Sequence, residues 1–422
     1  MPETETYTDI GDYKLGVMQL VNSAGGVVPL NDYFVQFSLS EDLFRNFLTA
    51  TMVITDVNNL PGVFPIIGNE QLLISFKTPK FADREITLNM ACVNYREKEV
   101  GENSKTQGYE LTFVSNSYLD GINKKISKAF EGRVSDIVDQ VIQENIDDPR
   151  SVEISQTDGK FKFVMPFTSP YETINFLKRK ASVSRKEFTD SSFMFYETSD
   201  GLNFKSLHEI KNQQPITELN YYPKNTSMAG VDERRFNSGE LMEFPRTFNR
   251  ILEMNGSMYS GAITKYDLTS KQIESKIVSL EDLDVKSNRL NAETLSPEEI
   301  KYFRKGILSH SVVNHQAFTQ NDIQDNRKLF DLFLNRNIDI LRSKSLTVTL
   351  VVPGNSDLSV GQVVYFDVPK IQVESETESA SDPVASGKYI LSKVEHVLLK
   401  NDYTCYIELI KDSVIESLIS AT

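Results

Sequence analysis

The chain is poor in the residues from which disulfide scaffolds and metal centres are built. Its 422 residues include two cysteines, four histidines and no tryptophan. Cys92 and Cys405 both lie in alternating, strand-like runs, where a lone thiol acts as a small buried hydrophobic group. A disulfide framework is therefore not expected, and assembly in a reducing cytoplasm fits the composition.

Targeting and membrane-spanning segments are also missing from the sequence. The first six residues are polar and acidic, and no basic region followed by an apolar stretch is present, so no signal peptide is expected. No run of about 18 apolar residues occurs, which predicts that the chain has no membrane-spanning helix.

Basic residues are outnumbered by acidic ones, which bears on the ligands that the chain can bind. There are 45 Lys and Arg against 59 Asp and Glu, and the formal net charge is −14. Proteins that bind nucleic acid gain affinity by neutralising phosphates with basic side chains. The balance argues against a dedicated nucleic-acid binder and against a polybasic protein of the membrane surface.

Sequence signatures of catalysis are absent. There is no Gly-x-Ser-x-Gly turn, no Gly-rich phosphate loop followed by Lys and no His-Glu-x-x-His zinc motif. The histidines are His208, His310, His315 and His396, and the closest two are five residues apart, a spacing that does not share a helix face. We expect no catalytic, cofactor-binding or metal-binding residues and no cofactor. His396 aligns with Tyr95 of a similar strand, which favours a packing role.

Two alternatives for chemistry rest on carboxylates. A retaining glycosidase needs two carboxyl groups about 5 Å apart in a cleft, and Glu172, Glu197 and Asp200 are the least arbitrary candidates for a hydrolase. The acidic stretch 374–382 is a second candidate, for Ca²⁺, but it lacks the fixed pattern of a known calcium loop and is better interpreted as a solvated loop. A protein without enzymatic activity is the favoured interpretation.

Aromatic and strand-forming residues are abundant. Hydrophobic residues make up 40% of the chain, which contains 25 Phe and 17 Tyr. This composition supports packed cores and favours β-rich structure. A length of 422 residues predicts about three domains.

One pattern occurs near each end of the chain. Two blocks recur in the same order and with similar spacing, and both copies are strand-rich and closed by turn residues. The matching blocks are residues 68–80 with 360–370 and residues 108–116 with 404–412. We infer an internal duplication of a β-module, at about residues 34–116 and 345–412.

Alternating runs predict the strands of the first copy. They are expected at residues 34–39, 49–55, 72–76, 86–95 and 109–114. Five or six strands in a segment of this length fit a small barrel or a sandwich.

After Ser117 the period of the apolar residues changes to that of a helix. A helix is expected over 126–146 with a buried face of Ile137, Val138, Val141 and Ile142. A second is expected from Pro170, with Ser or Thr as its cap and Ile174, Leu177 and Ala181 on its apolar face. Residues 193–207 predict a hairpin that turns at Asp200-Gly201.

Strands are expected to resume beyond residue 244, at 249–255 and 261–266. Residues 282–342 are charged and are predicted to be helical, and the chain then returns to strands from 345 to 410. The candidate core residues of the helical part are Leu332, Leu334, Ile338, Ile340 and Leu341.

Several segments match a known family in the same order along the chain. The most distinctive is Asn255–Lys271, which reads Asn-Gly-Ser-Met-Tyr-Ser-Gly-Ala-Ile-Thr-Lys-Tyr-Asp-Leu-Thr-Ser-Lys. The others are residues 170–181, 193–207, 352–363, 386–391 and 403–412. These segments resemble the baseplate central hub proteins of T4-like contractile-tailed bacteriophages. The likeness extends from about residue 13 to 412.

The resemblance implies a fold class and a domain division. The fold would be α+β and β-rich, with two similar tube-type β-barrel domains flanking and interrupted by mixed α/β regions. The expected divisions are a disordered N-terminus at 1–12, a first barrel at 13–117, a mixed α/β domain at 118–243, a second barrel split between 244–281 and 343–412, a helical insertion at 282–342 that packs with the middle domain, and a tail at 413–422. The acidic stretch 374–382 and the helical stretch 282–342 depart from the best-known hubs, and no lysozyme-like module is present.

The resemblance also implies a structural role in a virion. Such hubs form a homotrimeric ring in which six barrel domains adapt a sixfold tail tube above to a threefold cell-puncturing spike below. The implied partners are a second and third copy of the chain, a spike or tail lysozyme protein, a tail tube or tube-initiator protein, baseplate wedge proteins and the tape measure protein. The location would be the tail baseplate, after assembly in the host cytoplasm.

The ring would enclose a channel through which DNA leaves without specific binding. Acidic walls would suit this task because they repel phosphate, the inverse of binding by counterion release. An alternative function is that of a hub or tail-tip adhesion protein in another tail-like injection system.

Overall fold

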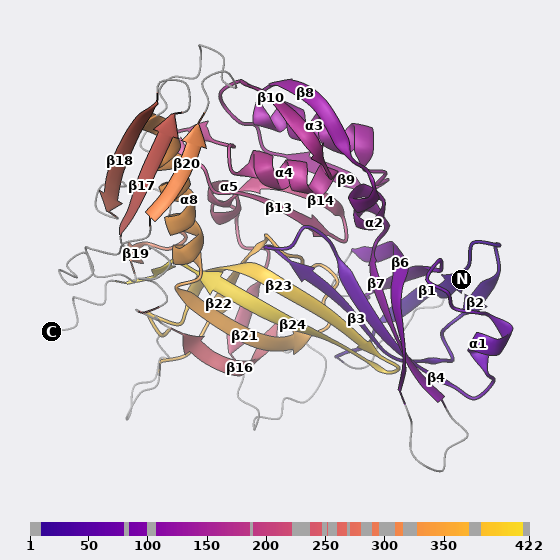
Figure 1. Cartoon of the computed structure of the whole chain (residues 1–422). Coiled ribbons are helices and arrows are strands. Elements are labelled where there is room, and N and C mark those ends of the chain that lie inside the picture. The colour runs from indigo at the N-terminus through magenta and orange to yellow at the C-terminus, as the bar shows by residue number, and fades with distance from the viewer. Residues whose placement is uncertain are drawn as a thin grey trace, which may run out of the picture.

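Strands dominate the chain and form a broad β layer, with a mixed α/β region packed on one side of it (Figure 1). The computed structural model describes residues 10–79, 84–98, 107–185, 189–221, 237–246, 251, 260–267, 271–279, 289–294, 309–314, 327–370 and 381–416. The predicted fold class, a β-rich α+β protein with β modules on either side of mixed α/β structure, is confirmed.

The first β region comprises the strands that precede residue 116. They are β1 (Lys14–Val21), β2 (Val27–Pro29), β3 (Phe34–Asp42), β4 (Thr49–Asp56), β5 (Gln71–Lys77), β6 (Glu85–Lys98) and β7 (Gln107–Ser115), and a short helix α1 (Leu60–Val63) follows β4. The sheet order is β2-β1-β5-β6-β7-β4-β3. The five strands expected from alternation are β3 to β7, so that prediction is confirmed.

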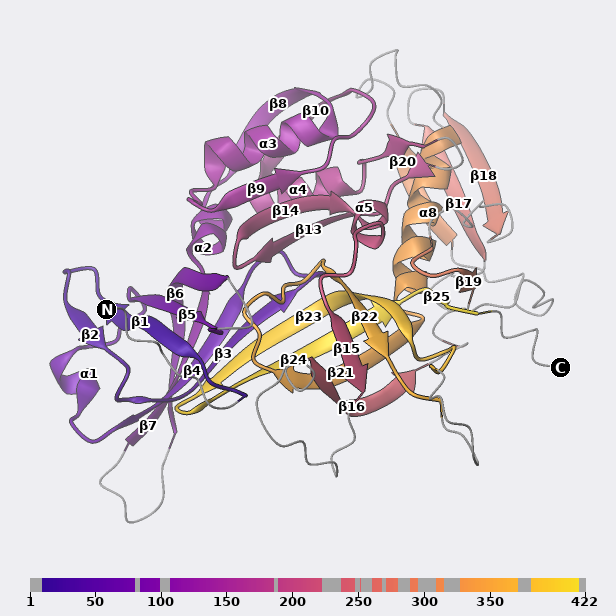
Figure 2. The same ribbon diagram turned by 180° about the vertical axis from the view of Figure 1, so that it is seen from behind.

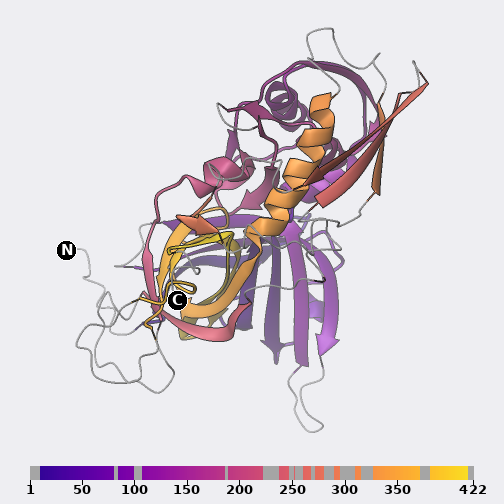
Figure 3. The same cartoon turned by 90° about the vertical axis from the view of Figure 1, so that its left-hand side faces the viewer.

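The second β region is a closed barrel. Its strands are β15 (Glu218–Tyr221), β16 (Ser238–Arg246), β21 (Leu346–Pro353), β22 (Val363–Asp367), β23 (Gly387–Leu399) and β24 (Asp402–Lys411). Pairing runs from β22 through β15, β16, β21 and β24 to β23, and β23 pairs with β22 to complete the circle. Figure 3 shows these strands curving around a common axis.

The two β regions are joined by the antiparallel pairing of β3 with β23. Seven residues of each strand are partners, from Gln36 opposite Leu399 to Asp42 opposite Lys393. The N-terminal part of β23 pairs with β22 on this edge, and β24 occupies the other edge. The first region therefore continues into the barrel as one sheet of 13 strands.

The two β regions repeat one another strand by strand. The order β5-β6-β7-β4-β3 corresponds to β22-β23-β24-β21-β16, and every neighbouring pair in both runs is antiparallel. Both copies have a β-bulge at the same point, between Cys92 and Asn94 in β6 and between Leu391 and Lys393 in β23. The predicted internal duplication is confirmed by this topology.

The ladders correct the alignment of the two copies at one point. Leu111 pairs with Tyr95, and its counterpart Ile407 pairs with Val394. Tyr95 therefore corresponds to Val394, and His396 lies two residues further along. Alternating strands look alike after a shift of two residues, so their sequences alone do not determine the register.

The middle α/β region extends from residue 116 to residue 211. It contains α2 (Asn116–Asn123), β8 (Ile126–Gly132), α3 (Val134–Asn145), β9 (Ser151–Ile154), β10 (Phe161–Thr168), α4 (Pro170–Lys178), β11 (Val183–Ser184), β12 (Thr189–Asp190), β13 (Phe193–Thr198), β14 (Gly201–Ser206) and α5 (Leu207–Lys211). The predicted hairpin is confirmed, because β13 and β14 pair in register around the turn.

The predicted helix over 126–146 is wrong in its first third. Residues 126–132 form β8, which pairs with β10, and the helix α3 begins at Val134 after Gly132 at φ 150°. A partner strand some thirty residues later outweighs local helical periodicity here. The predicted buried face of α3 and the cap of α4 are confirmed, since Ser169 and Glu172 form a capping box.

A three-stranded lateral sheet lies beside the helix α8 (Arg327–Ser343). Its strands are β17 (Ser260–Asp267), β18 (Gln272–Ser279) and β20 (Ser309–Asn314), and α8 runs along it from the barrel towards the middle region (Figure 3). Two short strands, β19 (Glu293–Thr294) and β25 (Ser413–Val414), pair below it.

The lateral sheet differs from two expectations. Residues 261–266 were predicted to belong to the second barrel, but they lie in β17 and pair with β18 and β20. Within 282–342 the described residues include the strand β20 as well as α8. An alternating run shows that a strand forms but not which sheet it joins. The domain boundaries stay a prediction, and acidic residues 374–380 lie outside the described residues.

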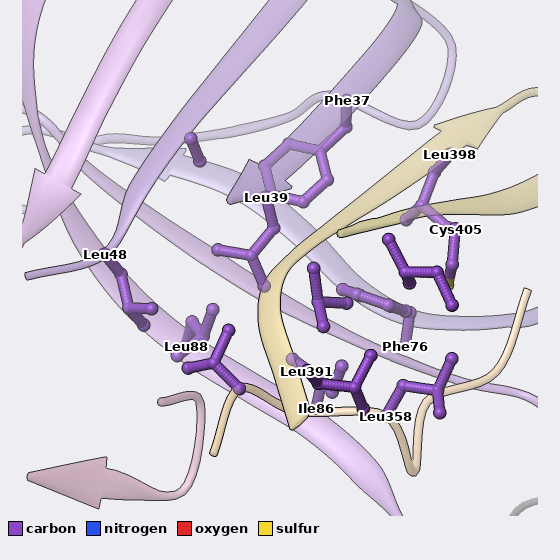
Figure 4. Packing of buried hydrophobic residues seen from close by; sticks show 14 of the residues in the cluster. Phe37, Leu39, Leu48, Phe76, Ile86, Leu88, Leu358, Leu391, Leu398 and Cys405 are labelled. Atoms are coloured by element: carbon purple, nitrogen blue, oxygen red, sulfur yellow. The ribbon is translucent and has the colours of Figure 1, made fainter. Parts of the chain in front are cut away.

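The two β regions share one hydrophobic core. Figure 4 shows Phe37, Leu39 and Phe76 of the first region packed against Leu391 and Leu398 of the second. The Phe76 ring lies edge-on to Phe37 and Tyr403, with centroid separations of 6.4 and 5.6 Å. A separate core fills the middle region. The repeat therefore forms a single packed body.

We predict that Phe76→Ala lowers the free energy of unfolding by about 3–5 kcal/mol, because it leaves a cavity where the two β regions meet. Urea unfolding followed by circular dichroism measures the loss. Val63→Ala is the control, since Val63 is 82% exposed and its truncation should change stability by less than about 0.5 kcal/mol. Equal effects of both variants would contradict a shared core at Phe76.

Candidate functional site: the buried junction of three regions

The hairpin β13–β14 lies between the two hydrophobic cores. Phe193 and Phe195 belong to the core of the middle region, whereas Met194 and Tyr196 belong to the core of the β regions. Successive side chains of a strand point to opposite faces, so one strand of alternating apolar residues serves both cores. This hairpin docks the middle region on the β layer.

Glu41 of β3 is the centre of the junction at the hairpin turn. The N–H and Oγ of Ser199 donate to its Oε1 at 2.9 and 2.7 Å. Ser359 Oγ and the N–H of Val360 donate to Oε2 at 2.6 and 3.1 Å. One fully buried carboxylate thus binds the middle region and the barrel to the first β region.

Burial alone would raise the pKa of Glu41, but the attraction of Arg84 and these hydrogen bonds lower it below its ordinary value. The carboxylate is therefore ionised at neutral pH. Hydrogen bonds to an ionised acceptor are stronger than neutral ones, which suits a group that holds three segments together.

Arg84 is the basic residue on the Glu41 side of the hairpin turn. Its Nε lies 2.9 Å from Asp200 Oδ1, and its guanidinium also donates to Ser199 and to the carbonyl oxygen of Ser356. The N–H of Arg84 donates to Asp357 Oδ1 at 3.1 Å. Arg84 therefore connects the start of β6 with the hairpin turn and with the barrel loop before β22.

Glu197, next to the turn, holds the other side of the hairpin. Its Oε2 accepts from the N–H of Leu48 at 3.1 Å and from Ser115 Oγ at 2.6 Å. Arg150 bridges Glu197 and Asp148. Burial raises the pKa of Glu197, and the attraction of Arg150 opposes that shift. The middle region is thus attached to β7 and to the segment before β4.

The turn itself requires glycine at position 201. Gly201 has φ 144°, and a Cβ there would lie 1.9 Å from the carbonyl oxygen of Ser151. The close approach permits the parallel pairing of β14 with β9. The Asp-Gly signal in the sequence thus marks a position where backbone meets backbone.

A second buried cluster lies where α5, α8 and the end of the barrel meet. Lys211 Nζ lies 2.7 Å from Asp339 and 2.9 Å from Asp412. These two carboxylates raise the pKa of Lys211 against the effect of burial. Lys211 and Arg342 lower the pKa of Asp412 to about 2, again against burial. This cluster connects the lateral helix, the middle region and the barrel.

His396 packs at the centre of the shared core. Its Nδ1 lies 2.7 Å from the hydroxyl oxygen of Tyr403 and 3.4 Å from Cys405 Sγ. Burial lowers the pKa of His396 to about 4, although Glu41 opposes this shift and Arg84 adds to it. The imidazole is neutral at pH 7, and the side chain is fully buried, which suits the packing role expected of it.

The carboxylates considered for hydrolysis all have structural contacts. Glu172 belongs to the capping box of α4 and its side chain is 64% exposed. Glu197 is fully buried and Asp200 pairs with Arg84. Glu197 and Asp200 lie on one hairpin, but the bonds described above hold each of them in the junction.

The remaining candidate residues are dispersed. His208 lies on α5 beside Asn212, at 2.9 Å, His310 lies in β20, and His315 lies outside the described residues. Cys92 and Cys405 are buried free thiols. In the part of the chain that the structure describes, no three His, Cys, Asp or Glu side chains are grouped as metal ligands. No helix there is long and apolar enough to span a membrane.

The junction residues Glu41, Arg84, Arg150 and Lys211 were not expected from the sequence. Each is a single charged residue in a strand, a loop or a short helix, and no motif surrounds it. Most of their partners lie far away in the chain: Glu41 and Ser359 are 318 residues apart, whereas Arg150 and its partner Asp148 are 2 residues apart. The Asp200-Gly201 turn is the one element of the junction with a local signal.

One known protein is similar to this chain in sequence. The chain is 22% identical over 335 residues to a probable baseplate hub protein, gp334, of Vibrio phage KVP40, and the match covers 76% of each chain. The predicted resemblance to baseplate hub proteins is confirmed. No family model matches the chain. The name of that relative describes a baseplate hub and mentions no reaction.

Two solved structures of tail proteins superpose on nearly the whole chain. A tail protein from Neisseria meningitidis MC58 superposes with a TM-score of 0.54 at 9% identity, over 95% of this chain and 97% of that one. The 43 kDa tail protein of prophage MuSo2 from Shewanella oneidensis gives 0.54 at 7% identity, over 94% and 99%. These likenesses establish the fold, which the chain shares with these two tail proteins.

We predict that Arg150→Ala lowers the free energy of unfolding by about 3–5 kcal/mol, because it leaves the buried carboxylates Glu197 and Asp148 without their cation. Thermal or urea unfolding of the purified variant measures this. Arg133→Ala is the matched control, since Arg133 pairs with Asp136 on the surface and its loss should leave the urea midpoint unchanged. A midpoint equal to wild type for Arg150→Ala would contradict the account of the junction.

A pH dependence follows from His396, whose pKa is lowered to about 4 from 6.5. Below about pH 6.5 the unfolded chain binds a proton that the folded chain does not, so stability falls as the pH drops from about 6.5 towards 4. At 1.36 kcal/mol per pKa unit the fall is roughly 3 kcal/mol.

The difference between wild type and His396→Leu isolates this contribution from the nearby groups Glu41, Arg84, Tyr403 and Cys405. Urea unfolding between pH 4 and 7 should show a smaller slope for His396→Leu than for wild type. Identical slopes for wild type and His396→Leu would show that folding does not lower the pKa of His396.

Proposed function

We propose that the chain is the hub subunit of a tail baseplate and forms a homotrimeric ring. The observation that carries the proposal is the strand-by-strand repeat, with its two copies fixed side by side through β3 and β23. Three chains would then present six similar β units around one axis. A ring of this kind matches sixfold symmetry on one face and threefold symmetry on the other.

The ring would close by heterologous contacts, in which one surface of each copy meets a different surface of the next. Unpaired edges of a sheet are prone to association, and closure removes them. The rigid junction around Glu41 supports this function because it holds the two β units and the middle region in one fixed orientation. A flexible link between the units would not keep the sixfold spacing.

The partners follow from the position of such a ring. A tail tube or tube-initiator protein would lie above it, a spike or tail lysozyme protein below it, and wedge proteins around it, with the tape measure protein in contact from the tube. The site of action is the virion baseplate, after assembly in the host cytoplasm. The role is structural and not enzymatic, which is supported by the structural use of Glu172, Glu197 and Asp200.

The lumen of the ring would pass DNA without binding it. The formal net charge of −14 supports an acidic channel, whose walls repel phosphate because they offer no cations to replace the counterions of DNA. A trimer structure with a basic lumen would contradict this part of the proposal.

Absolute mass by light scattering tests the ring. We expect a species of three times the 47.9 kDa of one chain, for the chain alone or with a co-expressed spike protein. The mass is measured at several protein concentrations, because assembly depends on concentration. Phe76→Ala serves as a control for a folding defect, because it disturbs the shared core without touching the outer surface. A monomer in both conditions would overturn the ring and favour the adhesion alternative.

A further inference from the structure

Two strands, β6 and β16, each have an edge that is unpaired within the described residues, although the corresponding edge in the other β region is paired. Inside the chain, β3 pairs with the outer edge of β23. The counterpart of β23 is β6, and the counterpart of β3 is β16. An intrachain contact between the two units therefore predicts where the next unit in a ring attaches.

The first of these edges belongs to the C-terminal half of β6. Residues 85–91 of β6 pair with β5, and residues from Met90 to Lys98 pair with β7 on the other edge. Beyond the bulge at Cys92, no strand within the described residues pairs with β6 on the side of β5. In β23 the same place, beyond the same bulge, is where β3 pairs. Val93 and its neighbours Asn94, Arg96 and Glu97 are exposed.

The second edge belongs to β16. One side of β16 pairs with β21 up to Arg246, and the other side pairs with β15 at Ser238 and Gly239. No strand in the described parts of the chain pairs with residues 241–246 on that second side. The matching residues of β3 are those that pair with β23.

The two edges lie far apart in the β layer. In Figure 2, seen from behind, β16 lies on the lower side of the barrel and β6 lies in the first β region, and Figure 1 shows the same separation. Edges separated in this way cannot pair within one chain. They are placed as a head-to-tail contact between copies requires.

We propose that β16 of one copy pairs in antiparallel fashion with the outer edge of β6 of the next copy. This interface would repeat the β3–β23 contact, so that all unit-to-unit contacts around the ring are equivalent. The inference rests on the proposed ring and names the strands that close it.

The ladders give the register of this interface. Ser38 pairs with Thr51, which pairs with Thr112. Glu243 pairs with Thr349, which pairs with Glu408, the counterpart of Thr112. Ser38 and Glu243 are therefore counterparts. Val397 and Lys98 are counterparts, because they pair with the matching residues Thr404 and Gly108. Since Ser38 pairs with Val397 inside the chain, Glu243 should lie opposite Lys98 of the next copy.

The predicted partners have opposite charges. A Glu directly opposite a Lys on an antiparallel pair contributes favourably, and like charges in that position are destabilising. The corresponding pair inside the chain, Ser38 and Val397, is uncharged. Residues of opposite charge at this register position would therefore favour the contact between copies.

Cysteine crosslinking of the full chain tests the interface. The variant Lys98→Cys with Glu243→Cys should give disulfide-linked dimers and trimers on a non-reducing gel after mild oxidation. The wild type should give none, because Cys92 and Cys405 are buried. Lys98→Cys with Arg246→Cys is the register control, since Arg246 lies two ladder steps away, about 7 Å along the strand, and a disulfide requires Cα atoms within about 7 Å.

We expect more linked product from the in-register pair than from the control pair, because only the in-register pair lies within the distance limit of a disulfide. A trimer by light scattering without this crosslink would overturn the interface and leave the proposed ring intact. Equal linking of the two pairs would overturn the register. A monomer without any crosslink would overturn the interface and the ring together.

Discussion

The pairing of β3 with β23 is the contact on which the architecture depends. It turns two copies of one β-module into a continuous sheet and brings their apolar faces into one core. Because backbone ladders are sterically specific, the angle and spacing of the two copies are determined by hydrogen bonds and not by a linker. Every larger assembly made from this chain inherits that spacing.

Buried charged residues hold the middle region on the sheet that β3 and β23 form. Glu41 and Arg84 each bind groups of the middle region and of the barrel, and Glu197 binds Leu48 and Ser115 of the first β region. Arg150 pairs with Glu197 from within the middle region. Buried ions are costly unless they are fully paired, so such a network tolerates few alternative arrangements. It adds specificity of docking more than stability, because apolar packing alone would allow the hairpin to slide.

Much of the fold was predictable from the sequence, and the reasons differ from element to element. The strands β3 to β7, the buried face of α3 and the capped helix α4 carry signals within ten or so residues, and these were predicted correctly. The duplication was visible because whole blocks recur in order. The strand β8 was missed because its partner β10 lies some thirty residues later. The strand at 261–266 was assigned to the wrong sheet, because an alternating run does not identify its partner strands. The junction was missed for the same reason, since one Glu in an alternating strand has the same local pattern whether it faces water or Ser359.

The separation of partners along the chain has a consequence for biosynthesis. The first β region leaves the ribosome complete, yet Glu41 still lacks Ser359, which is 318 residues away and emerges near the end of translation. Contacts of such long range are slow to form, and unpaired strand edges remain exposed until they do. The nascent chain therefore spends most of its synthesis with an open β3 edge and with Glu41 Oε2 lacking its barrel partners. The barrel closes only after its last strands, β23 and β24, have been made.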